Sequence, residues 1–155
     1  GAELSRQIIL VPVLRAGLGM LDAFLEIIPN AIICHVGTER QEEPPFQNIP
    51  YYNRLPEKID DEMIVIVLEN MVATGKSVGG VAEHARQRGA RDILAASWVA
   101  APEGIDYLEK ARSPIKLLTT AAVDRCLNPT GYICPGLGDA GDRINGTQPR
   151  ICAGV

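Results

Sequence analysis

Residues 63–77, MIVIVLENMVATGKS, hold the side chains whose types and spacing are best suited to chemistry. An acid and an amide, Glu69 and Asn70, directly follow an apolar run, and Lys76 and Ser77 follow a turn of small residues. Such a turn, when it leads into a helix, presents backbone N–H groups and the positive end of the helix dipole to an anion. The stretch therefore predicts a phosphate site, with an acid beside it to hold a hydroxylated group.

The same stretch comes close to the P-loop of nucleoside triphosphatases, G-x-x-x-x-G-K-[ST]. Gly75, Lys76 and Ser77 match the end of that motif. Asn70, however, stands where the first glycine lets the loop wrap around the phosphates, and Glu69 crowds the start of the loop. A P-loop NTPase is the less favoured interpretation of this stretch.

The surrounding elements must place these residues at the edge of a sheet. The apolar, mostly β-branched run at 63–68 predicts a buried parallel strand, and a helix is expected from Lys76 onward. Further strands are expected over 8–13, 31–36, 93–99 and 115–120, and further helices over 20–28 and 102–112. Pro12 indicates that the first strand ends near it. Strands alternating with helices predict an α/β fold with a doubly wound parallel sheet of about five strands.

Two loops with anion-binding character leave strand ends, one after Val13 and one after Leu68. If both bind one ligand, their strands must be neighbours, because ligands bind open parallel sheets where the strand order reverses. The expected strand order is then 2-1-3-4-5, numbered along the chain.

Two segments depart from this alternation. Residues 39–56 are rich in proline and carry Tyr51 and Tyr52, which favours a long excursion or an extended hairpin arm of functional importance. From Asp124 to 147, repeated glycines and two prolines predict a structured loop without regular helix or strand. Glycines in such a loop allow backbone groups to approach a flat ligand closely.

The composition narrows the functional classes. A chain of 155 residues that is 46% hydrophobic can form a single domain over 1–155 with a sheet core. A net charge of −4 and a pI near 5.2 argue against nucleic-acid and membrane-surface binding. Four cysteines without C-x-x-C spacing argue against a zinc site and favour a reducing, cytoplasmic compartment. They are Cys34, which is expected in the core, and Cys126, Cys134 and Cys152.

Five motifs together resemble uracil phosphoribosyltransferase, a family of type I phosphoribosyltransferases. Residues 63–77 resemble the site that binds 5-phosphoribosyl-1-diphosphate (PRPP) in that family. The other four, in matching order and spacing, are VPVLRAGLGM at 11–20, VGTERQEE at 36–43, VAAPEGI at 99–105 and GYICPGLGDAGD at 131–142. The last is specific to the family as its uracil-recognition loop, which corresponds here to 124–147. The resemblance extends from about Ile8 to Thr147 and nearly covers the chain.

The resemblance implies an enzyme that transfers the 5-phosphoribosyl group of PRPP to uracil, giving UMP and diphosphate in pyrimidine salvage. Mg²⁺ would arrive chelated by PRPP, without a direct protein ligand. The implied partners are small molecules, with GTP as an effector in some relatives, and neither nucleic acid nor membrane. A homo-oligomer, dimeric or larger, is also implied.

The resemblance also assigns roles to residues. Arg15 and Arg40 would contact the diphosphate, Glu69 the ribose hydroxyls, and Asp139 would lie near PRPP and complete the catalytic set with the two arginines. The implied PRPP-binding residues are Arg15, Arg40, Glu69, Asn70, Met71, Val72, Ala73, Thr74, Gly75, Lys76, Ser77 and Asp139. The implied uracil-binding residues, acting largely through backbone groups, are Ile133, Gly138, Asp139 and Ala140.

The chain departs from the family pattern in three places. Glu69-Asn70 replaces the usual Asp-Pro, Lys76 replaces a common glycine, and the segment that relatives carry before the first core strand is expected to be missing. These departures leave two alternatives open: a non-catalytic regulatory homologue that binds PRPP or a nucleotide, and an inactive fragment.

Overall fold

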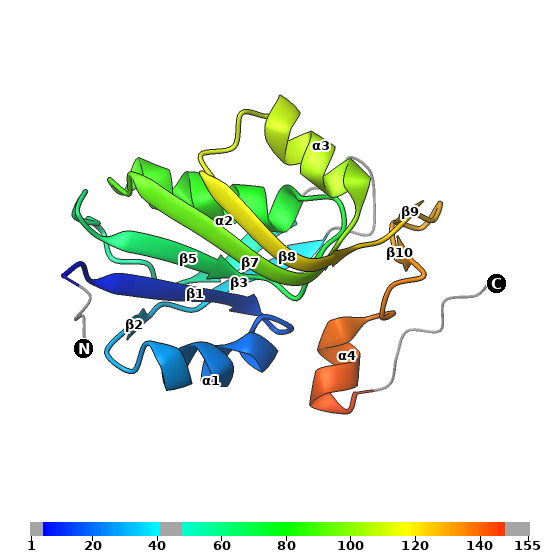
Figure 1. Cartoon of the computed structure of the whole chain (residues 1–155), viewed down its shortest axis with the longest axis horizontal. Helices are drawn as coiled ribbons and strands as arrows, with labels where there is room; N and C mark the ends of the chain where they lie inside the picture. The colour runs from blue at the N-terminus through cyan, green and yellow to red at the C-terminus, as the bar shows by residue number, and fades with distance from the viewer. Residues whose placement is uncertain (1–4, 41–47, 148–155) are drawn as a thin grey trace.

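The computed structural model describes residues 5–40 and 48–147 of the chain, and the side chains of 39, 40, 48 and 49 lie outside the described set. Within it, a mostly parallel sheet carries α1 (Leu18–Ile27) on one face and α2 (Lys76–Gln87) and α3 (Pro102–Lys110) on the other (Figure 1). The strands of the main sheet are β1 (Ile8–Leu14), β2 (Ile32–Ile33), β3 (Val36–Arg40), β4 (Asn48–Asn53), β5 (Ile64–Leu68), β6 (Met71–Val72), β7 (Asp92–Ala100) and β8 (Leu117–Val123). This arrangement confirms the predicted α/β class.

The strand order also matches the prediction. β1 lies in the middle, with β2 and β3 on one side and β5, β7 and then β8 on the other, all parallel. The five expected strands correspond to β1, to β2 with β3, and to β5, β7 and β8. Numbered along the chain, they lie in the predicted order 2-1-3-4-5. β4 extends the sheet beyond β3 as an antiparallel edge strand, and β6 pairs with β7 beyond the end of β5.

Both faces of the sheet are covered, which explains why β5 is apolar along its whole length. Val65 and Val67 point into the larger core beneath α2 and α3, whereas Leu68 faces the smaller core beneath α1. Burying each such side chain completely contributes about 1.5–3 kcal/mol to folding. The two cores therefore fix β1 and β5 side by side, and with them the two loops that leave these strands.

The first strand has nearly the expected bounds. β1 ends at Leu14, one residue beyond the expected strand and two beyond Pro12. Pro12 pairs with β5, and on its other side β2 partners β1 only up to Leu10 while β3 begins at Val13. The missing N–H of proline thus falls in a gap between two partner strands. The second expected strand is interrupted at Cys34, which is buried in the core as predicted.

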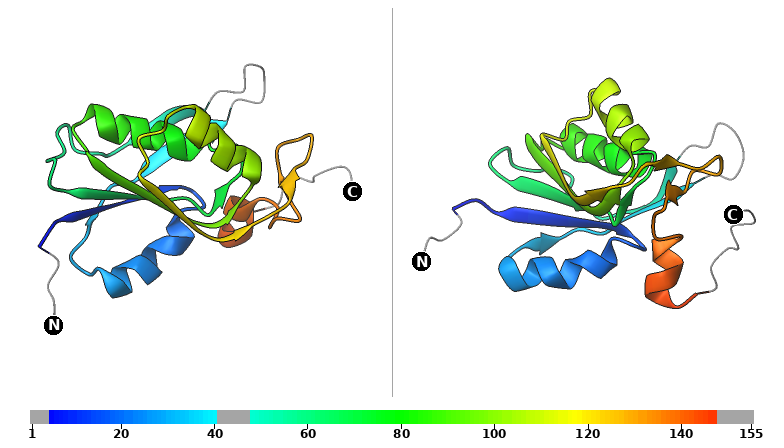
Figure 2. Two further views of the ribbon diagram at one scale, coloured as in Figure 1. Left: turned by 45° about the horizontal axis from the view of Figure 1, so that its top comes forward. Right: turned by 45° about the vertical axis from the view of Figure 1, so that its right-hand side comes forward.

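The prediction that the C-terminal segment lacks regular structure is wrong. It contains a two-stranded antiparallel sheet, β9 (Cys126–Leu127) with β10 (Ile133–Cys134), and a short helix, α4 (Ala140–Asn145). Gly131, Gly136 and Gly138 lie between these elements and all have positive φ. They form the turns rather than preventing the strands and the helix. Figure 2 shows β9, β10 and α4 beyond the arrowheads of the central strands.

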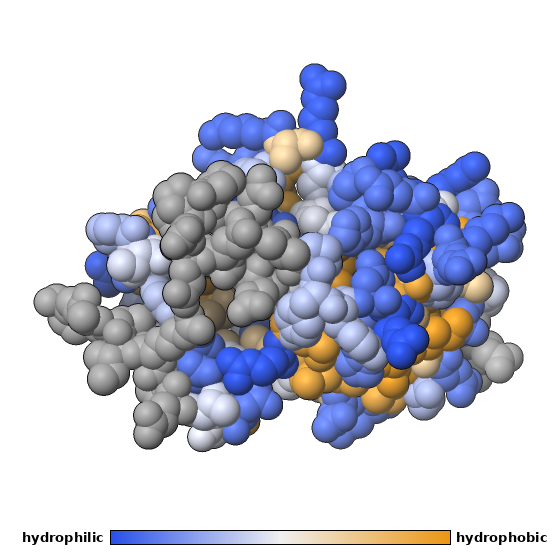
Figure 3. Space-filling model, turned by 180° about the vertical axis from the view of Figure 1, so that it is seen from behind, coloured by the Kyte–Doolittle hydropathy of each residue, from blue (hydrophilic) through white to orange (hydrophobic). Residues whose placement is uncertain are grey.

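The surface combines charged and apolar regions. Seen from behind, the molecule gathers apolar side chains on one part of its surface (Figure 3). Exposed apolar residues on the elements of that side include Ile27 at the end of α1 and Ile32 and Ile33 on β2. Among the residues described, no helix combines the length and apolar character that crossing a membrane would require.

Candidate functional site

The carboxyl ends of β1, β5 and β7 meet on the side of the sheet where α4 lies (Figures 1 and 2). We call this region the carboxyl edge and define it by Arg15, Glu69, residues 73–77 and residues 133–142. Ligands of open parallel sheets bind at such an edge, next to the point where the strand order reverses. The structure therefore brings three of the sequence motifs to one place.

Arg15 connects the loop after β1 to the C-terminal segment. Its Nη2 donates to Asp142 Oδ1 at 2.8 Å, and its Nη1 donates to Thr147 Oγ1 at 3.3 Å. The Asp142 side chain is 9% exposed, whereas that of Arg15 remains 48% exposed. The hydrogen bond from Arg15 to Asp142 raises the pKa of the guanidinium. Arg15 is thus held in place by a buried carboxylate and still reaches solvent.

Asp142 is a residue that the sequence prediction missed. It lies in the first turn of α4 and also accepts a hydrogen bond from Thr147 Oγ1 at 2.7 Å. A cation directly after a buried strand, such as Arg15, needs an anionic partner. The second acid of the GDAGD motif was the signal that could have identified Asp142 as this partner.

Asp139 begins α4 as its N-cap. Its Oδ1 accepts a hydrogen bond from the Asp142 N–H at 2.9 Å, which satisfies one of the free donors at the helix start. The Asp139 carboxylate also contributes to the raised pKa of Arg15. Asp139 therefore faces the same guanidinium as Asp142 without being its direct partner.

The turn before α2 has a conformation that requires glycine. Gly75 has φ = 74°, and a Cβ at this position would lie 2.6 Å from the carbonyl oxygen of Gly104 on α3. Gly75 is also the N-cap of α2 and has no side chain to accept from the first N–H groups of the helix. The helix start is thus built as the sequence predicted, with backbone donors and a dipole suited to an anion.

Glu69 follows β5 directly and is half-buried. Burial raises the pKa of its carboxyl group from 4.5 to about 8. The side chain is therefore largely protonated at neutral pH, and a ligand that favours the carboxylate would shift this balance. A strongly perturbed acid at a strand end is typical of a functional site.

Asn70 is completely buried, and neither of its amide atoms has a hydrogen-bond partner among the described residues. Its Nδ2 lies close to Gly19 on α1, where an added Cβ would be 3.5 Å away. The same Cβ would come within 2.9 Å of Ile144 on α4, so Asn70 and Ile144 both lie close to Gly19. Leaving such a group unpaired costs about 1–3 kcal/mol. Its direct contact with PRPP remains a prediction.

The other predicted residues lie in several environments. Val72 on β6, Ile133 and Ala140 are buried, whereas Lys76 and Met71 are half-buried. Gly138 is exposed, has φ = 72° and has open space around the position of a Cβ. The backbone of Arg40 ends β3, and its side chain lies outside the described set.

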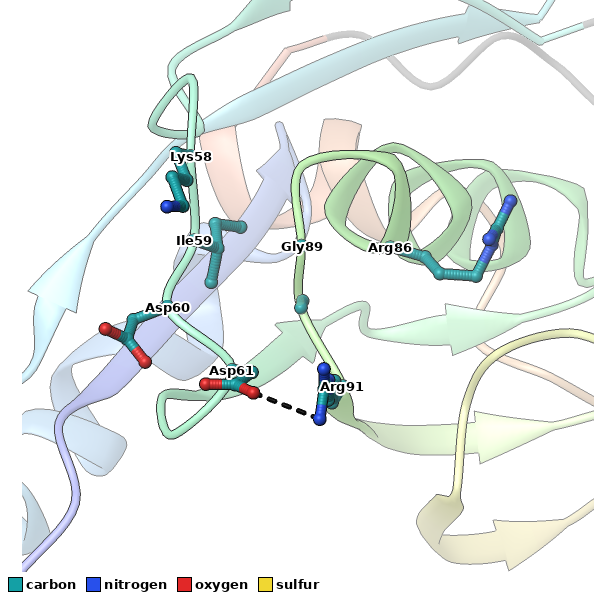
Figure 4. A pocket seen from close by; sticks show the side chains of 8 residues that line it. Lys58, Ile59, Asp60, Asp61, Arg86, Gly89 and Arg91 are labelled. Carbon is teal, nitrogen blue, oxygen red and sulfur yellow. Dashed lines mark ion pairs between the residues drawn. The ribbon is translucent and has the colours of Figure 1, made fainter.

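A hollow of about 560 Å³ lies at the opposite end of the strands from the carboxyl edge, near the amino ends of β5 and β7 (Figure 4). Its lining residues are Lys58, Ile59, Asp60, Asp61, Arg86, Gly89, Ala90 and Arg91. Arg91 and Asp61 form an ion pair across it at 3.0 Å. None of the residues predicted to bind PRPP or uracil lines this hollow. Within the described ranges, no group of three or more His, Cys, Asp or Glu residues could hold a metal ion.

Comparisons with known proteins agree with this arrangement. Residues 1–147 match the sequence profile of the family described as uracil phosphoribosyltransferase. The solved structure of the AQ2163 protein from Aquifex aeolicus is 37% identical to this chain, with a TM-score of 0.81 over 88% of the chain. This chain spans 64% of the AQ2163 chain, which is just under two thirds of its length.

Two more distant structures share the fold. A purine phosphoribosyltransferase from Pyrococcus horikoshii is 18% identical, with a TM-score of 0.54 over 61% of this chain and 62% of its own. A hypoxanthine phosphoribosyltransferase from Trypanosoma cruzi, complexed with its product IMP, is 14% identical, with a TM-score of 0.58 over 81% of this chain and 63% of its own. At these identities the likeness establishes the fold alone.

Proposed function

The chain belongs to the uracil phosphoribosyltransferase family, and we propose that it transfers the 5-phosphoribosyl group of PRPP to uracil, giving UMP and diphosphate. One observation carries the proposal beyond family membership. The Arg15–Asp142 pair joins the loop after β1 to the C-terminal segment, at the same edge as the turn before α2. A helix start suited to phosphate, a cation and a glycine-rich loop thus lie at the edge where α/β sheets bind their ligands, which supports the proposal.

In the proposed complex, the 5-phosphate of PRPP occupies the turn formed by residues 73–77. The N–H groups at the start of α2 donate to the phosphate oxygens, and the helix dipole favours their negative charge. Gly75 supports this position because its conformation packs the turn closely against α3. The hydroxyl of Thr74 provides a further donor.

Glu69 accepts hydrogen bonds from the ribose hydroxyls in this proposal. A carboxylate can accept from both hydroxyls, whereas a protonated carboxyl must use one oxygen as a donor. Because the pKa of free Glu69 is about 8, binding at neutral pH would release a proton from it. We therefore expect the affinity for PRPP to increase as the pH rises toward 8.

Arg15 binds the diphosphate leaving group. Its guanidinium can form two parallel hydrogen bonds to a phosphate group, and Asp142 already fixes its orientation. Charge that develops on the diphosphate as the anomeric carbon–oxygen bond breaks is then stabilised by a group that needs no rearrangement. Magnesium enters as part of the PRPP substrate and neutralises further charge on the diphosphate.

Uracil lies against the C-terminal segment in this proposal. Backbone groups of Ile133, Gly138, Asp139 and Ala140 hold its polar edge, so that a ring nitrogen faces the anomeric carbon. Open space around Gly138 and its positive φ support a close approach by a flat ring. Catalysis then consists mainly of positioning the base and stabilising the leaving group.

The test is incubation of the protein with labelled uracil, PRPP and Mg²⁺, followed by separation of UMP and diphosphate. Hypoxanthine is the matched control, because structures of the same fold include a hypoxanthine phosphoribosyltransferase. We expect product with uracil and at least about 100-fold less with hypoxanthine, since a site that hydrogen-bonds one base rejects another with unmatched groups. IMP without UMP would contradict the assignment of uracil.

A non-catalytic homologue that binds PRPP is the second candidate. The observation in its favour is the largely protonated Glu69, which leaves the ribose site without its full negative charge at neutral pH. Calorimetric binding of PRPP, without UMP formation at high protein concentration, would support this candidate. The family match covers residues 63–77, and we therefore interpret the P-loop-like ending at Gly75, Lys76 and Ser77 as coincidental.

A further inference from the structure

Two cysteines in the C-terminal segment lie opposite each other although their spacing in the sequence is not that of a C-x-x-C motif. Cys126 on β9 and Cys134 on β10 are directly paired in the antiparallel register. Opposite residues of such a pair have Cα atoms about 4.5–5.5 Å apart and side chains on the same face. A disulfide requires Cα atoms about 4.4–6.8 Å apart, so this register places the two cysteines at a backbone separation that a disulfide can span.

Hydrogen bonds on the turn side of the cysteines hold this register. The Asn128 N–H donates to the carbonyl of Tyr132 at 2.8 Å. The Asn128 side-chain oxygen accepts from the N–H groups of Thr130 at 3.1 Å and Tyr132 at 2.9 Å. The turn is thus closed by the side chain of one residue.

The open end of the hairpin is held as well. Asp124 Oδ2 accepts from the Gly136 N–H at 2.8 Å, and the Arg125 N–H donates to the Cys134 carbonyl at 3.1 Å. Glu103 on α3 accepts from the Leu127 N–H at 2.9 Å and attaches β9 to the body of the protein. The cysteine pair is therefore fixed from both sides before any bond joins it.

The three cysteines in the described residues differ in access. Cys126 is exposed and Cys134 is half-buried, so a small oxidant can reach the pair. Cys34 is buried, and burial raises the pKa of its thiol, which lowers its reactivity. Reactivity is thus concentrated in the hairpin.

We propose that Cys126 and Cys134 form a reversible disulfide, a redox modification site that closes the β9–β10 hairpin. The oxidant is a small-molecule disulfide such as oxidised glutathione. The Cys126 thiolate attacks one sulfur of that disulfide and releases one glutathione. The Cys134 thiolate then attacks the sulfur of Cys126 and releases the second. Two protein thiols are oxidised, one glutathione disulfide is reduced, and the two thiol protons end on the released glutathiones.

The disulfide can form whether or not the proposed transfer reaction takes place. Its consequence for the base site rests on the proposed function, because the hairpin lies next to the segment proposed to hold uracil. Ile133 precedes Cys134 directly, and Gly138, Asp139 and Ala140 follow it. Joining the two strands removes their freedom to separate. The disulfide therefore links the oxidation state of the hairpin to the rigidity of the proposed base site.

The test uses the full chain, equilibrated with mixtures of reduced and oxidised glutathione and then treated with an alkylating reagent. Trypsin cleaves after Arg125 and Arg143 and releases both cysteines in one peptide, 126–143. We expect this peptide to lose two hydrogen atoms and to escape alkylation. A second cleavage by chymotrypsin after Tyr132 should leave two halves joined by the bond, and dithiothreitol should separate them.

The folded protein should prefer the Cys126–Cys134 disulfide because the β9–β10 register holds the two residues opposite each other. The same equilibration in concentrated urea, where this register is lost, is therefore the reference. The folded protein should favour the closed disulfide over mixed disulfides at least about tenfold more than the unfolded chain does. Cys152→Ser should leave this preference unchanged. Asn128→Ala, which removes the side chain that closes the turn, should reduce the preference by roughly threefold or more.

Cys126→Ser keeps the test informative if Asn128→Ala does not fold. It should abolish the peptide that lacks two hydrogen atoms and leave Cys134 alkylated or joined to glutathione. The proposal is overturned if Cys126 and Cys134 of the folded wild-type protein carry separate labels. It is also overturned if they pair mainly with Cys152, or if folding gives no preference over urea.

Discussion

The two ends of the central strands treat polar groups in opposite ways. We call the end opposite the carboxyl edge the amino edge, and define it by Arg6, Asp61, Arg91, Asp92 and Lys116. Here charges are satisfied by each other: Asp92 pairs with both Arg6 and Lys116, and Arg91 pairs with Asp61. The two cations next to Asp92 lower the pKa of its carboxyl group, as expected for a structural ion pair.

The carboxyl edge keeps its polar groups in costly states. Burial raises the pKa of Glu69. Among the residues that the structure describes, Asn70 has no partner for either amide atom and no side chain caps the start of α2. Arg15 is held by Asp142 but remains half exposed. Groups that do not stabilise the fold are retained for another purpose, and ligand binding is that purpose in our account. The hollow at the amino edge, by contrast, contains an ion pair between two of its own lining residues, Arg91 and Asp61.

The largest expected contrast between the edges comes from removing one arginine at each. Arg15→Ala should lower kcat/KM by about 1000-fold, because a charge-assisted contact to the leaving group is lost in the transition state. Arg6→Ala at the amino edge should change kcat/KM by less than about twofold, because its ion pair with Asp92 and its hydrogen bonds to the Glu62 and Met63 carbonyls lie at the other end of the strands. Steady-state kinetics with PRPP and uracil measure both. Similar losses in the two variants would remove the distinction between the edges.

The next contrast separates activity from stability within the carboxyl edge. Asp139→Asn should reduce kcat/KM by about 100-fold, since a carboxylate that can stabilise positive charge developing on the anomeric carbon disappears. The unfolding free energy should change by less than about 0.5 kcal/mol, because asparagine is an equally good N-cap for α4. Kinetics and urea denaturation of the same preparation provide both values. A loss of stability as large as the loss of activity would identify Asp139 as structural.

Glu69 should give the fold an unusual dependence on pH. Its pKa is about 8 in the folded protein and 4.5 in the unfolded chain, so the folded state binds the proton more tightly. Glu69 therefore destabilises the fold progressively as the pH rises from 4.5 to 8, and by a constant amount above 8. Glu69→Gln should stabilise the protein at pH 8.5 by about 2 kcal/mol, less than the full shift implies because the side chain keeps some solvent contact. At pH 4.5 it should have little effect.

Glu83 on α2 is the matched control with the opposite sign. Its hydrogen bond from Arg86 lowers its pKa to about 2, so it stabilises the fold above pH 4.5 and loses this effect as the pH falls toward 2. Glu83→Gln should therefore reduce stability at neutral pH. Denaturation of both variants across this pH range would contradict the account if Glu69→Gln destabilised the protein at pH 8.5.

The smallest expected effect is at the amino edge. Lys116→Ala removes one of the two cations that pair with Asp92, and Arg6 remains. The unfolding free energy should fall slightly in low salt and by less in high salt, because exposed ion pairs are screened. Thermal unfolding at two salt concentrations measures this effect. A loss of catalytic activity in Lys116→Ala would show that the amino edge contributes to function.

The sequence predicted the centre of the sheet better than its margins. Apolar runs such as residues 64–68 are buried on both faces, so their pattern alone indicates strands, and the two anion-binding loops determined the strand order. The sequence placed the end of the first strand to within one residue, but the tolerance of Pro12 inside β1 depends on where β2 stops and β3 begins. That gap is a property of the assembled sheet and leaves no local signal.

The candidate site was also predicted only in part, because some of its features are local in sequence and others arise only in the assembled fold. The turn at 73–77 is local, and its glycine and helix start could be recognised from adjacent residues. The pairing of Arg15 with Asp142 joins positions 127 residues apart, and that of Cys126 with Cys134 depends on the turn closed by Asn128. Such contacts arise only when the C-terminal segment folds into β9, β10 and α4. Frequent glycines predict an absence of regular structure in that segment, whereas Gly131, Gly136 and Gly138 form the turns between its elements.

The central claim is that PRPP binds at the carboxyl edge, and amide chemical shifts of the ¹⁵N-labelled protein test it most directly. Titration with PRPP and Mg²⁺ should shift the amide signals of residues 73–77 and of Arg15. The signals of Lys58, Asp60, Asp61 and Arg91 around the hollow should remain in place. Shifts confined to the hollow, or unchanged signals at residues 73–77 with PRPP at millimolar concentration, would contradict the account.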